Sequence, residues 1–182
     1  MQFIKTRAVK SPVRNVQENA GIDCYIPENT CEFIKDLATK NPGLELYVTD
    51  IFKDSTYLNG CKTNYFVKSC GKIYIAPHKD IIIPSGIRSK FGPHLALIAN
   101  NKSGIATKKK LFKGAELIDS DYLGNIHVHL FNHSDEEVSF TKGDKIGQFV
   151  MRQVWMGPVI QVSEIEKDTE RGEGKFGSTG DR

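Results

Sequence analysis

The sequence predicts an all-β fold of the sandwich, barrel or jelly-roll type, with one helical interruption. Short apolar and partly β-branched runs recur along the chain, bounded by Pro, Gly, Asn or Asp, at residues 73–75, 81–83, 95–98 and 149–151. In addition, Ile126, Val128 and Leu130 alternate with polar residues, which is the period of a half-buried strand. Many short strands at close spacing are typical of sheets that close on themselves or pack in two layers.

The interruption lies within residues 29–72. Asn29-Thr30-Cys31-Glu32 resembles a capping box, which marks the N-terminus of a helix. Four apolar residues then fall on one helical face: Phe33, Ile34, Leu37 and Ala38. Asn41-Pro42-Gly43 ends the helix, and a strand-like alternation follows at Leu44, Leu46 and Val48. We expect this insertion to pack as a small lobe on the outside of the β domain, flanking the functional site without supplying catalytic groups.

Length and composition limit the classes of function. The 182 residues suffice for one domain with a core, and the net charge of +3 is too small to indicate nucleic-acid binding. No apolar run approaches the roughly 18 residues that a membrane span needs. The four cysteines lack the paired spacing of a zinc site, although Cys31, Cys61 and Cys70 with His78 leave that alternative open. We expect a protein of the reducing cytoplasm that binds neither nucleic acid nor membrane.

The C-terminal residues 163–182 differ in composition from the domain that precedes them, residues 1–162. Their only large apolar side chains are Ile165 and Phe176, so this segment cannot bury enough surface to fold alone. Its glycines, hydroxyls and arginine are groups that bind anions. The segment is therefore either a frayed terminus or a flexible arm that orders over a phosphate-bearing ligand.

Of three other polar segments, two have two interpretations each. Residues 118–124 form an acidic hairpin turn or place a carboxylate beside a phosphate site. Residues 101–104 form a turn or a small anion-binding nest, and residues 143–148 form a turn that leads into a strand. Alternation alone places His127 and His129 on one face of their strand, which leaves a metal site as the minor alternative.

Taken together, these segments resemble the five motifs of the trimeric dUTPase family, in the family's order. The motifs are Ala20-Gly21-Ile22-Asp23, Lys102-Ser103-Gly104, Leu117 to Tyr122 with Gly124, Gly143-Asp144-Lys145-Ile146 with Gln148, and Arg171 to Gly180. The resemblance covers residues 1–28 and 73–182, and the insertion has no counterpart in it.

The resemblance implies a distorted jelly roll that forms a homotrimer with shared active sites. It also implies Mg²⁺-dependent hydrolysis of dUTP to dUMP and pyrophosphate, which controls the dUTP level and supplies dUMP for thymidylate synthesis. Asp119 would be the general base, and Asp23 would act on Mg²⁺ through water. The substrate would be held by Lys102, Ser103, Gly104, Ile118, Tyr122, Gln148, Arg171, Phe176, Gly177, Ser178 and Thr179. One subunit would give the first, second and fourth motifs, a second the third motif, and a third its tail.

Three departures from the family pattern leave alternatives open. Lys102 stands where the family has arginine, and Glu116 and Lys175 stand where glycine is usual. Glu116 lies next to the expected position of the base. The alternatives are a related dCTP-directed hydrolase or deaminase, and a dUTPase-like regulatory binding protein that meets a protein partner through residues 29–72.

Overall fold

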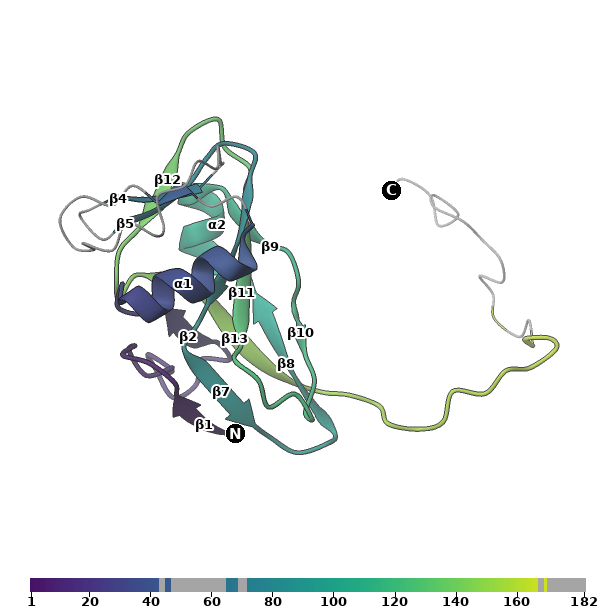
Figure 1. Cartoon of the computed structure of the whole chain (residues 1–182). Coiled ribbons are helices and arrows are strands. Elements are labelled where there is room, and N and C mark those ends of the chain that lie inside the picture. Colours follow the sequence, from purple (N-terminus) through teal and green to yellow (C-terminus); the bar gives the residue numbers. More distant parts are fainter. Residues whose placement is uncertain (43–44, 47–64, 69–71, 167–168, 170–182) are drawn as a thin grey trace.

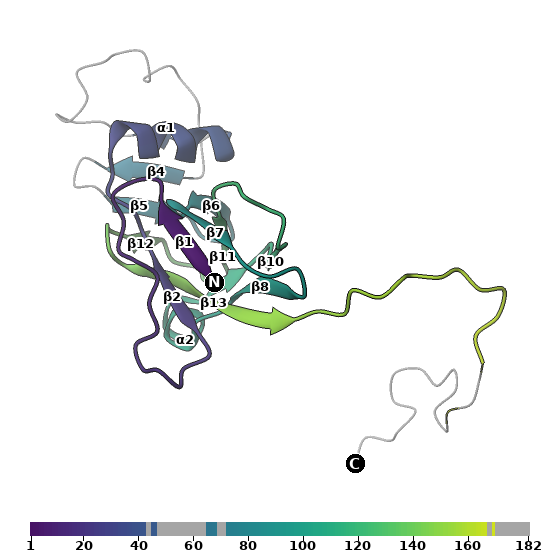
Figure 2. The ribbon, with the colours of Figure 1, turned by 90° about the horizontal axis from the view of Figure 1, so that it is seen from below.

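The computed structural model describes residues 1–42, 45–46, 65–68, 72–166 and 169. It shows a body of short strands with a helix on each of two sides, and a C-terminal segment that runs away from the body (Figure 1, Figure 2). The fifth motif, at residues 171–180, lies outside the described residues, as do Leu44, Val48, Cys61 and Cys70.

The elements follow the chain in a mostly β order. They are β1 (Gln2–Lys5), β2 (Ile22–Tyr25), α1 (Cys31–Lys40), β3 (Glu45–Leu46), β4 (Tyr65–Lys68), β5 (Lys72–Ile75), β6 (Asp80–Pro84), β7 (Ile87–Lys90), β8 (Leu95–Asn100), α2 (Ser103–Lys109), β9 (Leu111–Lys113), β10 (Leu117–Ile118), β11 (His127–Asn132), β12 (Val138–Phe140) and β13 (Lys145–Gln153). The four apolar runs and the alternating segment each lie in or overlap a strand, so the prediction of an all-β fold is confirmed.

The described strands form four small sheets whose neighbours come from distant parts of the chain. Their orders are β10-β8-β13-β2, β6-β11-β9, β12-β5-β4-β3 and β1-β7. Every described pair is antiparallel except β3 with β4. Antiparallel strands that pair far from their sequence neighbours are the arrangement expected of a jelly roll.

The core lies between these sheets. Val128 and Leu130 on β11 are buried, whereas His127 and His129 beside them are half-buried, as the alternation predicts. Ile83 on β6 and Phe149 on β13 reach the same core. Burial of such side chains is the main favourable contribution to folding.

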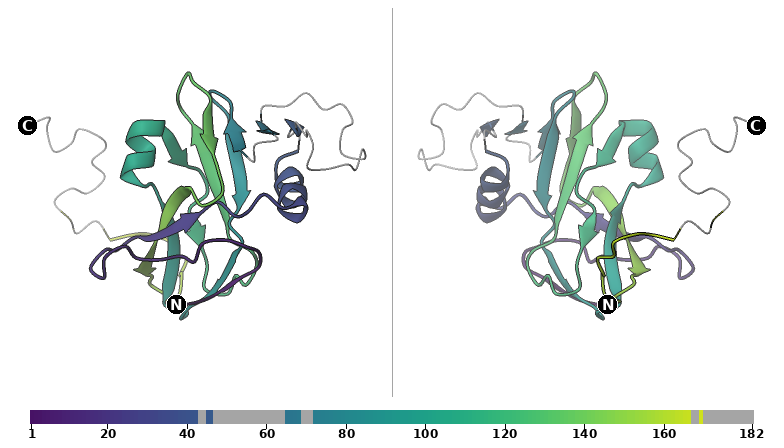
Figure 3. Two further views of the ribbon diagram at one scale, coloured as in Figure 1. Left: turned by 90° about the vertical axis from the view of Figure 1, so that its left-hand side faces the viewer. Right: turned by 90° about the vertical axis from the view of Figure 1, so that its right-hand side faces the viewer.

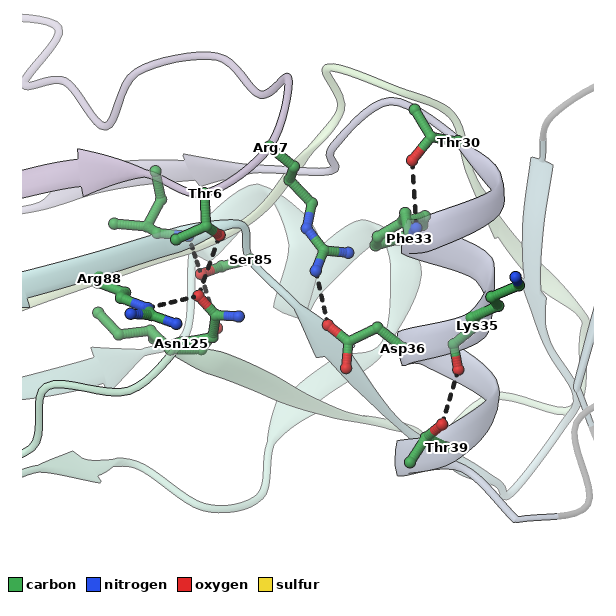
Figure 4. Close-up of polar contacts among 12 residues, drawn as sticks. Thr6, Arg7, Thr30, Phe33, Lys35, Asp36, Thr39, Ser85, Arg88 and Asn125 are labelled. Carbon is green, nitrogen blue, oxygen red and sulfur yellow. Dashed lines mark hydrogen bonds and ion pairs between the residues drawn. The ribbon is translucent and has the colours of Figure 1, made fainter.

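Helix α1 is part of this core rather than a separate lobe. Phe33 and Leu37 are fully buried, and Ile34 is 5% exposed, so the predicted apolar face is confirmed. The N-cap is Thr30, whose hydroxyl accepts a hydrogen bond from the Phe33 N–H at 3.2 Å. The cap is therefore one residue later than the predicted capping box, and Glu32 is not at the position that would complete such a box. Figure 4 shows the Arg7 guanidinium donating to Asp36 of the same helix at 2.7 Å.

Asn41 attaches the end of α1 to the edge of a sheet. Its Nδ2 donates to the Ile82 carbonyl and its Oδ1 accepts from the Ile82 N–H, both at 2.8 Å. The side chain thus imitates one pair of a strand ladder on β6, and it is 6% exposed. In Figure 3, α1 and α2 lie on opposite sides of the strands, and most of the rest of the insertion lies outside the described residues.

Helix α2 was not predicted from the sequence, which indicated only a turn or a small anion-binding nest at residues 101–104. Its N-cap residue, Lys102, makes no side-chain cap, and Lys110 ends the helix in the left-handed region at φ 52°. The segment is helical because Ile105 is buried against the body. Neither α1 nor α2, the two helices of the described chain, is long and apolar enough to span a membrane.

After β13 the described chain makes no further helix or strand. The last strand ends at Gln153, and the Val154 N–H still donates to the His94 carbonyl at 3.0 Å. The segment that follows exposes large apolar side chains: Trp155, Met156, Val159, Ile160, Val162 and Ile165. Several large apolar side chains exposed along one short segment are typical of a segment that another protein surface covers.

Candidate active site

A cluster of charged side chains lies where β2, β13 and the start of α2 meet. The Asp23 carboxylate accepts hydrogen bonds from Lys102 Nζ at 2.8 Å and from Asn15 Nδ2 at 2.8 Å. Lys145 Nζ is 2.5 Å from the second carboxylate oxygen. The structure thus brings together the first, second and fourth motifs, as the resemblance implied for one subunit.

Strand pairing places these residues. Asp23 on β2 is opposite Gln148 on β13, and Gln148 is in turn opposite Asn100 at the end of β8. The β2–β13 pairing shifts register between Lys145 and Gly147, which is a β-bulge. Because an extra residue changes which face a side chain takes, the bulge allows Lys145 and Gln148 to lie beside the same partner, Asp23.

The Gln148 side chain lies over the first motif. Its Nε2 donates to the Asn101 carbonyl at 3.0 Å, just before the helix α2. A Cβ at position 21 would overlap the Gln148 amide as it lies, so glycine at this position leaves room for that side chain. The Gln148 side chain therefore packs against Gly21, and its backbone pairs with Asp23.

The charge balance of the cluster favours an anion. Burial by itself raises the pKa of the Asp23 carboxyl, but the hydrogen bonds from Lys102, Lys145 and Asn15 together hold it below its ordinary value. The bond to Asp23 raises the pKa of Lys145. Two cations therefore face one buried anion, and the cluster carries a net charge of about +1.

Both lysines remain accessible to a ligand. Their side chains are 27% and 36% exposed, whereas that of Asp23 is only 3% exposed beneath them. An ammonium group has three N–H donors, of which the contact with Asp23 uses one. Asp23 thus orients Lys102 and Lys145 while their other donors face outward, an arrangement that can bind phosphate oxygens. Ser103 and Gly104, next to Lys102, are exposed on the same helix start.

The described residues do not fit a protein-built Mg²⁺ site. Both oxygens of Asp23 are taken by N–H donors, and its carboxylate is nearly closed to solvent. No group of three His, Cys, Asp or Glu side chains within the described ranges could hold a metal ion. His129 contacts Asp80 instead, and His127 is half-buried beneath α1.

The third motif lies at the other end of the same sheet. Ile118 on β10 is opposite Leu97 on β8, so Asp119 reaches the level of Ala96. Asn100 lies four residues further along β8 than Ala96, which is about 13 Å at a strand rise of about 3.3 Å per residue. Lys102 lies beyond Asn100. Figure 1 shows α2 at one end of β8 and the β10 hairpin at the other. One chain therefore does not bring Asp119 to the Asp23 cluster.

The hairpin itself is held in a compact form. Tyr122 Oη donates to the Asn125 carbonyl at 2.7 Å, and its ring lies so close to Gly124 that a Cβ there would overlap it. Asn125 Oδ1 accepts from the Thr6 hydroxyl at 3.0 Å and from Arg88 Nε at 3.4 Å, as Figure 4 shows. Asp119 and Tyr122 are both accessible from solvent, as groups that act on a ligand must be.

Sequence reasoning did not single out Lys113, which lies beneath the site. Its Nζ donates to the Ile146 carbonyl at 2.6 Å, within the bulge of β13, and a Cβ at Gly147 would collide with it. Burial lowers the pKa of Lys113 to about 8 and raises the pKa of the neighbouring Cys24 thiol to about 12. No sequence signal marks this lysine, because its neighbours come from strands distant in the chain. Asn15 was missed for the same reason.

A model of the dUTPase family matches residues 62–180, which include the second to fifth motifs. This chain belongs to the dUTPase family. The first motif precedes the matched range, and it joins the second and fourth in the cluster around Asp23. The family expectation drawn from the motifs, including the all-β fold, is confirmed.

Named relatives support this family membership. The chain is 39% identical over 111 residues to the deoxyuridine 5'-triphosphate nucleotidohydrolase of Candida albicans, covering 60% of this chain and 65% of that protein. It is 35% identical over 117 residues to the mitochondrial enzyme of that name from Homo sapiens, covering 64% of this chain and 43% of that protein. The aligned part thus spans less than two thirds of these relatives' own length.

Solved structures of family members share the fold. A dUTPase of Staphylococcus bacteriophage 80alpha, a mutant form with dUpNHpp, matches with a TM-score of 0.69 at 19% identity, covering 98% of this chain and 97% of that one. The dUTPase of phage phi11 of S. aureus, described as showing a species-specific insert, matches with a TM-score of 0.62 at 16% identity over 91% of this chain and 97% of that one.

Proposed function

We propose that this protein hydrolyses dUTP to dUMP and pyrophosphate. The observation that carries the proposal is the cluster in which Asp23 orients Lys102 and Lys145. The match of the dUTPase family model to residues 62–180 supports it. The partly exposed ammonium groups of this cluster suit a polyphosphate, because each keeps donors that Asp23 does not use.

In the proposed reaction, different residues serve in substrate binding and in proton transfer. Lys102, Ser103 and Gln148 bind phosphate oxygens at the α2 end of the sheet. Asp119 accepts the proton of the water that attacks the α-phosphorus, and pyrophosphate leaves. In such a transfer the protein contributes mainly alignment and charge stabilisation. Tyr122 lies against the deoxyribose, and backbone groups from Glu116 to Ile118 read the uracil.

The separation of Asp119 from the Asp23 cluster supports a site shared between subunits. A homotrimer places the hairpin of one subunit beside the cluster of the next. The exposed apolar segment of residues 155–165 gives a second subunit a surface to cover. Residues 171–180 then close over the ligand, with Arg171, Gly177, Ser178 and Thr179 on phosphate and Phe176 on the base.

The shared site has a direct test. Sedimentation measures whether the protein has three times the 20.4 kDa mass of one chain. Asp119→Asn and Lys102→Met are then mixed under conditions that exchange subunits. Recovery of activity in the mixture supports shared sites, since some sites receive both intact groups. A mixture as inactive as its components contradicts them.

Mg²⁺ is proposed to arrive with the triphosphate. Mg²⁺ is usually bound through substrate phosphates and retained waters with few protein carboxylates, which agrees with the absence of a fitting ligand set among the described side chains. A bound ion would neutralise phosphate charge. Asp23 contributes to this scheme by orienting the two lysines, since both of its oxygens already accept N–H donors.

A nucleotide panel tests the function. The full chain is assayed with dUTP, dCTP, dTTP and UTP, with and without Mg²⁺, and the products are separated by chromatography. Release of dUMP and pyrophosphate from dUTP alone, lost on chelation, is the expected result. Deamination or hydrolysis of dCTP would favour the dCTP-directed alternative. Binding of dUTP without turnover would favour a regulatory protein that acts through residues 29–72.

A further inference from the structure

The chain changes sheets between β9 and β10. Lys113 at the end of β9 is opposite Leu130 on β11, whereas Leu117 at the start of β10 is opposite Ile98 on β8. Residues 114–116 belong to neither ladder, so their backbone groups need other partners. These three residues lead directly into the segment that the proposed function assigns to the base.

Three hydrogen bonds fix this crossing, and His129 accepts two of them. The Gly114 N–H donates to the His129 carbonyl at 3.1 Å, and the Ala115 N–H donates to His129 Nδ1 at 3.2 Å. On the other side of the crossing, the Ala99 N–H donates to the Glu116 carbonyl at 2.8 Å. The imidazole is the only side chain in these three bonds.

The geometry sets the tautomer of His129. A backbone N–H can only donate, so Nδ1 must be the unprotonated nitrogen that accepts from Ala115. The proton then lies on Nε2, which is 2.8 Å from Asp80 Oδ2. Asp80 is on β6, the strand that pairs with β11, so the ring is held from the side opposite to the crossing.

Gly114 gives independent evidence that the ring belongs at this place. A Cβ at position 114 would overlap Nδ1 and two carbon atoms of the imidazole. The ring therefore lies directly against the backbone of the crossing, where only glycine leaves room. The side chain of His129 is 27% exposed, so most of it is covered by this contact and its neighbours.

We propose that His129, held by Asp80, is a positioning residue that fixes the chain at Ala115 and so places the base-reading segment from Glu116 to Ile118. This inference rests on the proposed function. Glu116 directly follows Ala115, so it depends most on this hydrogen bond to His129, the tether. Asp119 lies beyond the pairs that Leu117 and Ile118 make with β8, so it depends less on the tether. Loss of the tether therefore weakens nucleotide binding more than it slows the chemical step.

A matched pair of substitutions separates the two contacts of the ring. His129→Asn places an amide oxygen near the position of Nδ1, so it keeps an acceptor for Ala115 and loses Asp80. His129→Gln reaches the position of Nε2, so it loses the acceptor for Ala115. Gly114→Ala disturbs the same contact from the backbone side. We expect the Gln and Ala variants to behave alike and the Asn variant to stay close to the parent protein.

The measurements distinguish the tether from the function. In ¹⁵N-histidine-labelled parent protein, long-range NMR correlations should show the Nε2–H tautomer for the signal that His129→Asn removes. Hydrogen exchange at the Ala115 amide should be faster in His129→Gln and unchanged in His129→Asn. With dUTP as substrate, KM should rise about five- to tenfold in His129→Gln, as expected for one lost hydrogen bond, with kcat within about twofold.

Three results would overturn the proposal. The first is an Nδ1–H tautomer in the parent protein, and the second is unchanged Ala115 exchange in His129→Gln. The third is faster exchange with no change in KM or in the Kd of a non-hydrolysable dUTP analogue. Should the parent protein neither turn over dUTP nor bind the analogue, the proposed function fails, and the role of His129 in base placement fails with it. The exchange data still report on the tether alone.

Discussion

Lys113 on β9 donates a hydrogen bond from Nζ to the carbonyl of Ile146 on β13, across 2.6 Å. The acceptor lies in the bulge where β13 shifts register against β2. Lys113 thus joins the strand that precedes the third motif to the strand that carries the fourth. The bulge orients Lys145 and Gln148 toward Asp23, so a lysine with no expected role supports the geometry of the cluster.

The buried environment of Lys113 predicts a stability change in mild alkali. Its pKa is about 8 in the fold against 10.5 when unfolded, so the unfolded chain binds more protons between these values and stability rises with pH there. Between pH 7 and 9 we expect the free energy of unfolding to rise by about 1 kcal/mol relative to Lys113→Met. Urea titrations of both proteins at the two pH values measure this.

Comparison with Lys113→Met also controls for the pH dependence that the neighbouring Cys24 thiol contributes. The pKa of Cys24 is raised to about 12, so the fold keeps that proton above pH 9 and stability from this group falls as pH rises. Removing Lys113, which lowers the pKa of Cys24, can only raise that pKa further, so the folded thiol stays protonated from pH 7 to 9 in both proteins and its contribution cancels in the difference. A difference that stays constant from pH 7 to 9 would contradict the lowered pKa of Lys113.

Asp23→Asn should destabilise the protein and weaken nucleotide binding. The change leaves Lys102 and Lys145 facing each other without their shared anion, and we expect a loss of about 1–3 kcal/mol at neutral pH, since both lysines still reach water. The lowered pKa of Asp23 means that its stabilisation is present above about pH 4 and is lost as pH falls below it. Denaturation at pH 7 and pH 3 should therefore show the difference between the two proteins shrinking in acid. An equal difference at both pH values would exclude an ionised Asp23.

Asp119→Asn should keep dUTP binding and lose turnover. Removal of a positioned general base typically lowers the rate by about 10²–10⁴-fold. Asp121→Asn, a change of the same charge in the same hairpin, is the matched control and should keep most of the activity. Rates and the Kd of a non-hydrolysable analogue are measured for both. Near-parental turnover in Asp119→Asn would show that water is activated elsewhere.

Truncation after Ile165 should leave the fold intact and remove most of the activity. The last strand ends at Gln153, so no element of the described structure is lost. Arg171 and Phe176 are removed, and both are proposed to hold the ligand. Circular dichroism melting and dUTP turnover are compared with the single change Phe176→Ala, which should give a smaller loss. Full activity of the truncated chain would remove the fifth motif from the site.

Asn41→Ala should destabilise the fold without a direct effect on chemistry. The substitution leaves the N–H and carbonyl of Ile82 without the partner that covers them, which typically costs about 1–3 kcal/mol. Thr39→Ala removes an exposed hydrogen bond to the Lys35 carbonyl on the same helix and should change stability little. Denaturant titration measures both. Because Phe33 and Leu37 are core residues, replacement of residues 29–72 by a linker should also destabilise the domain.

Local sequence was enough to establish the fold class, the helix at Phe33 to Leu37 and the family. Apolar periodicity indicates which face of a strand or helix is buried, and each motif is a short continuous segment whose place in the sequence order is known. Local sequence did not predict α2, a seven-residue helix without a side-chain cap, because its formation depends on burying Ile105 in the core of the folded domain.

The grouping of the charged side chains depends instead on contacts between distant parts of the chain. The pairing of Asp23 with Lys102 and Lys145, the bond of Lys113 to the β13 bulge, and the contact of His129 with Ala115 all join segments distant in the sequence. Asp119 likewise lies at the opposite end of β8 from Lys102, which no local pattern indicates. The physical reason is that sheet register and bulges, set by packing of the whole core, place these side chains, and local sequence does not encode them.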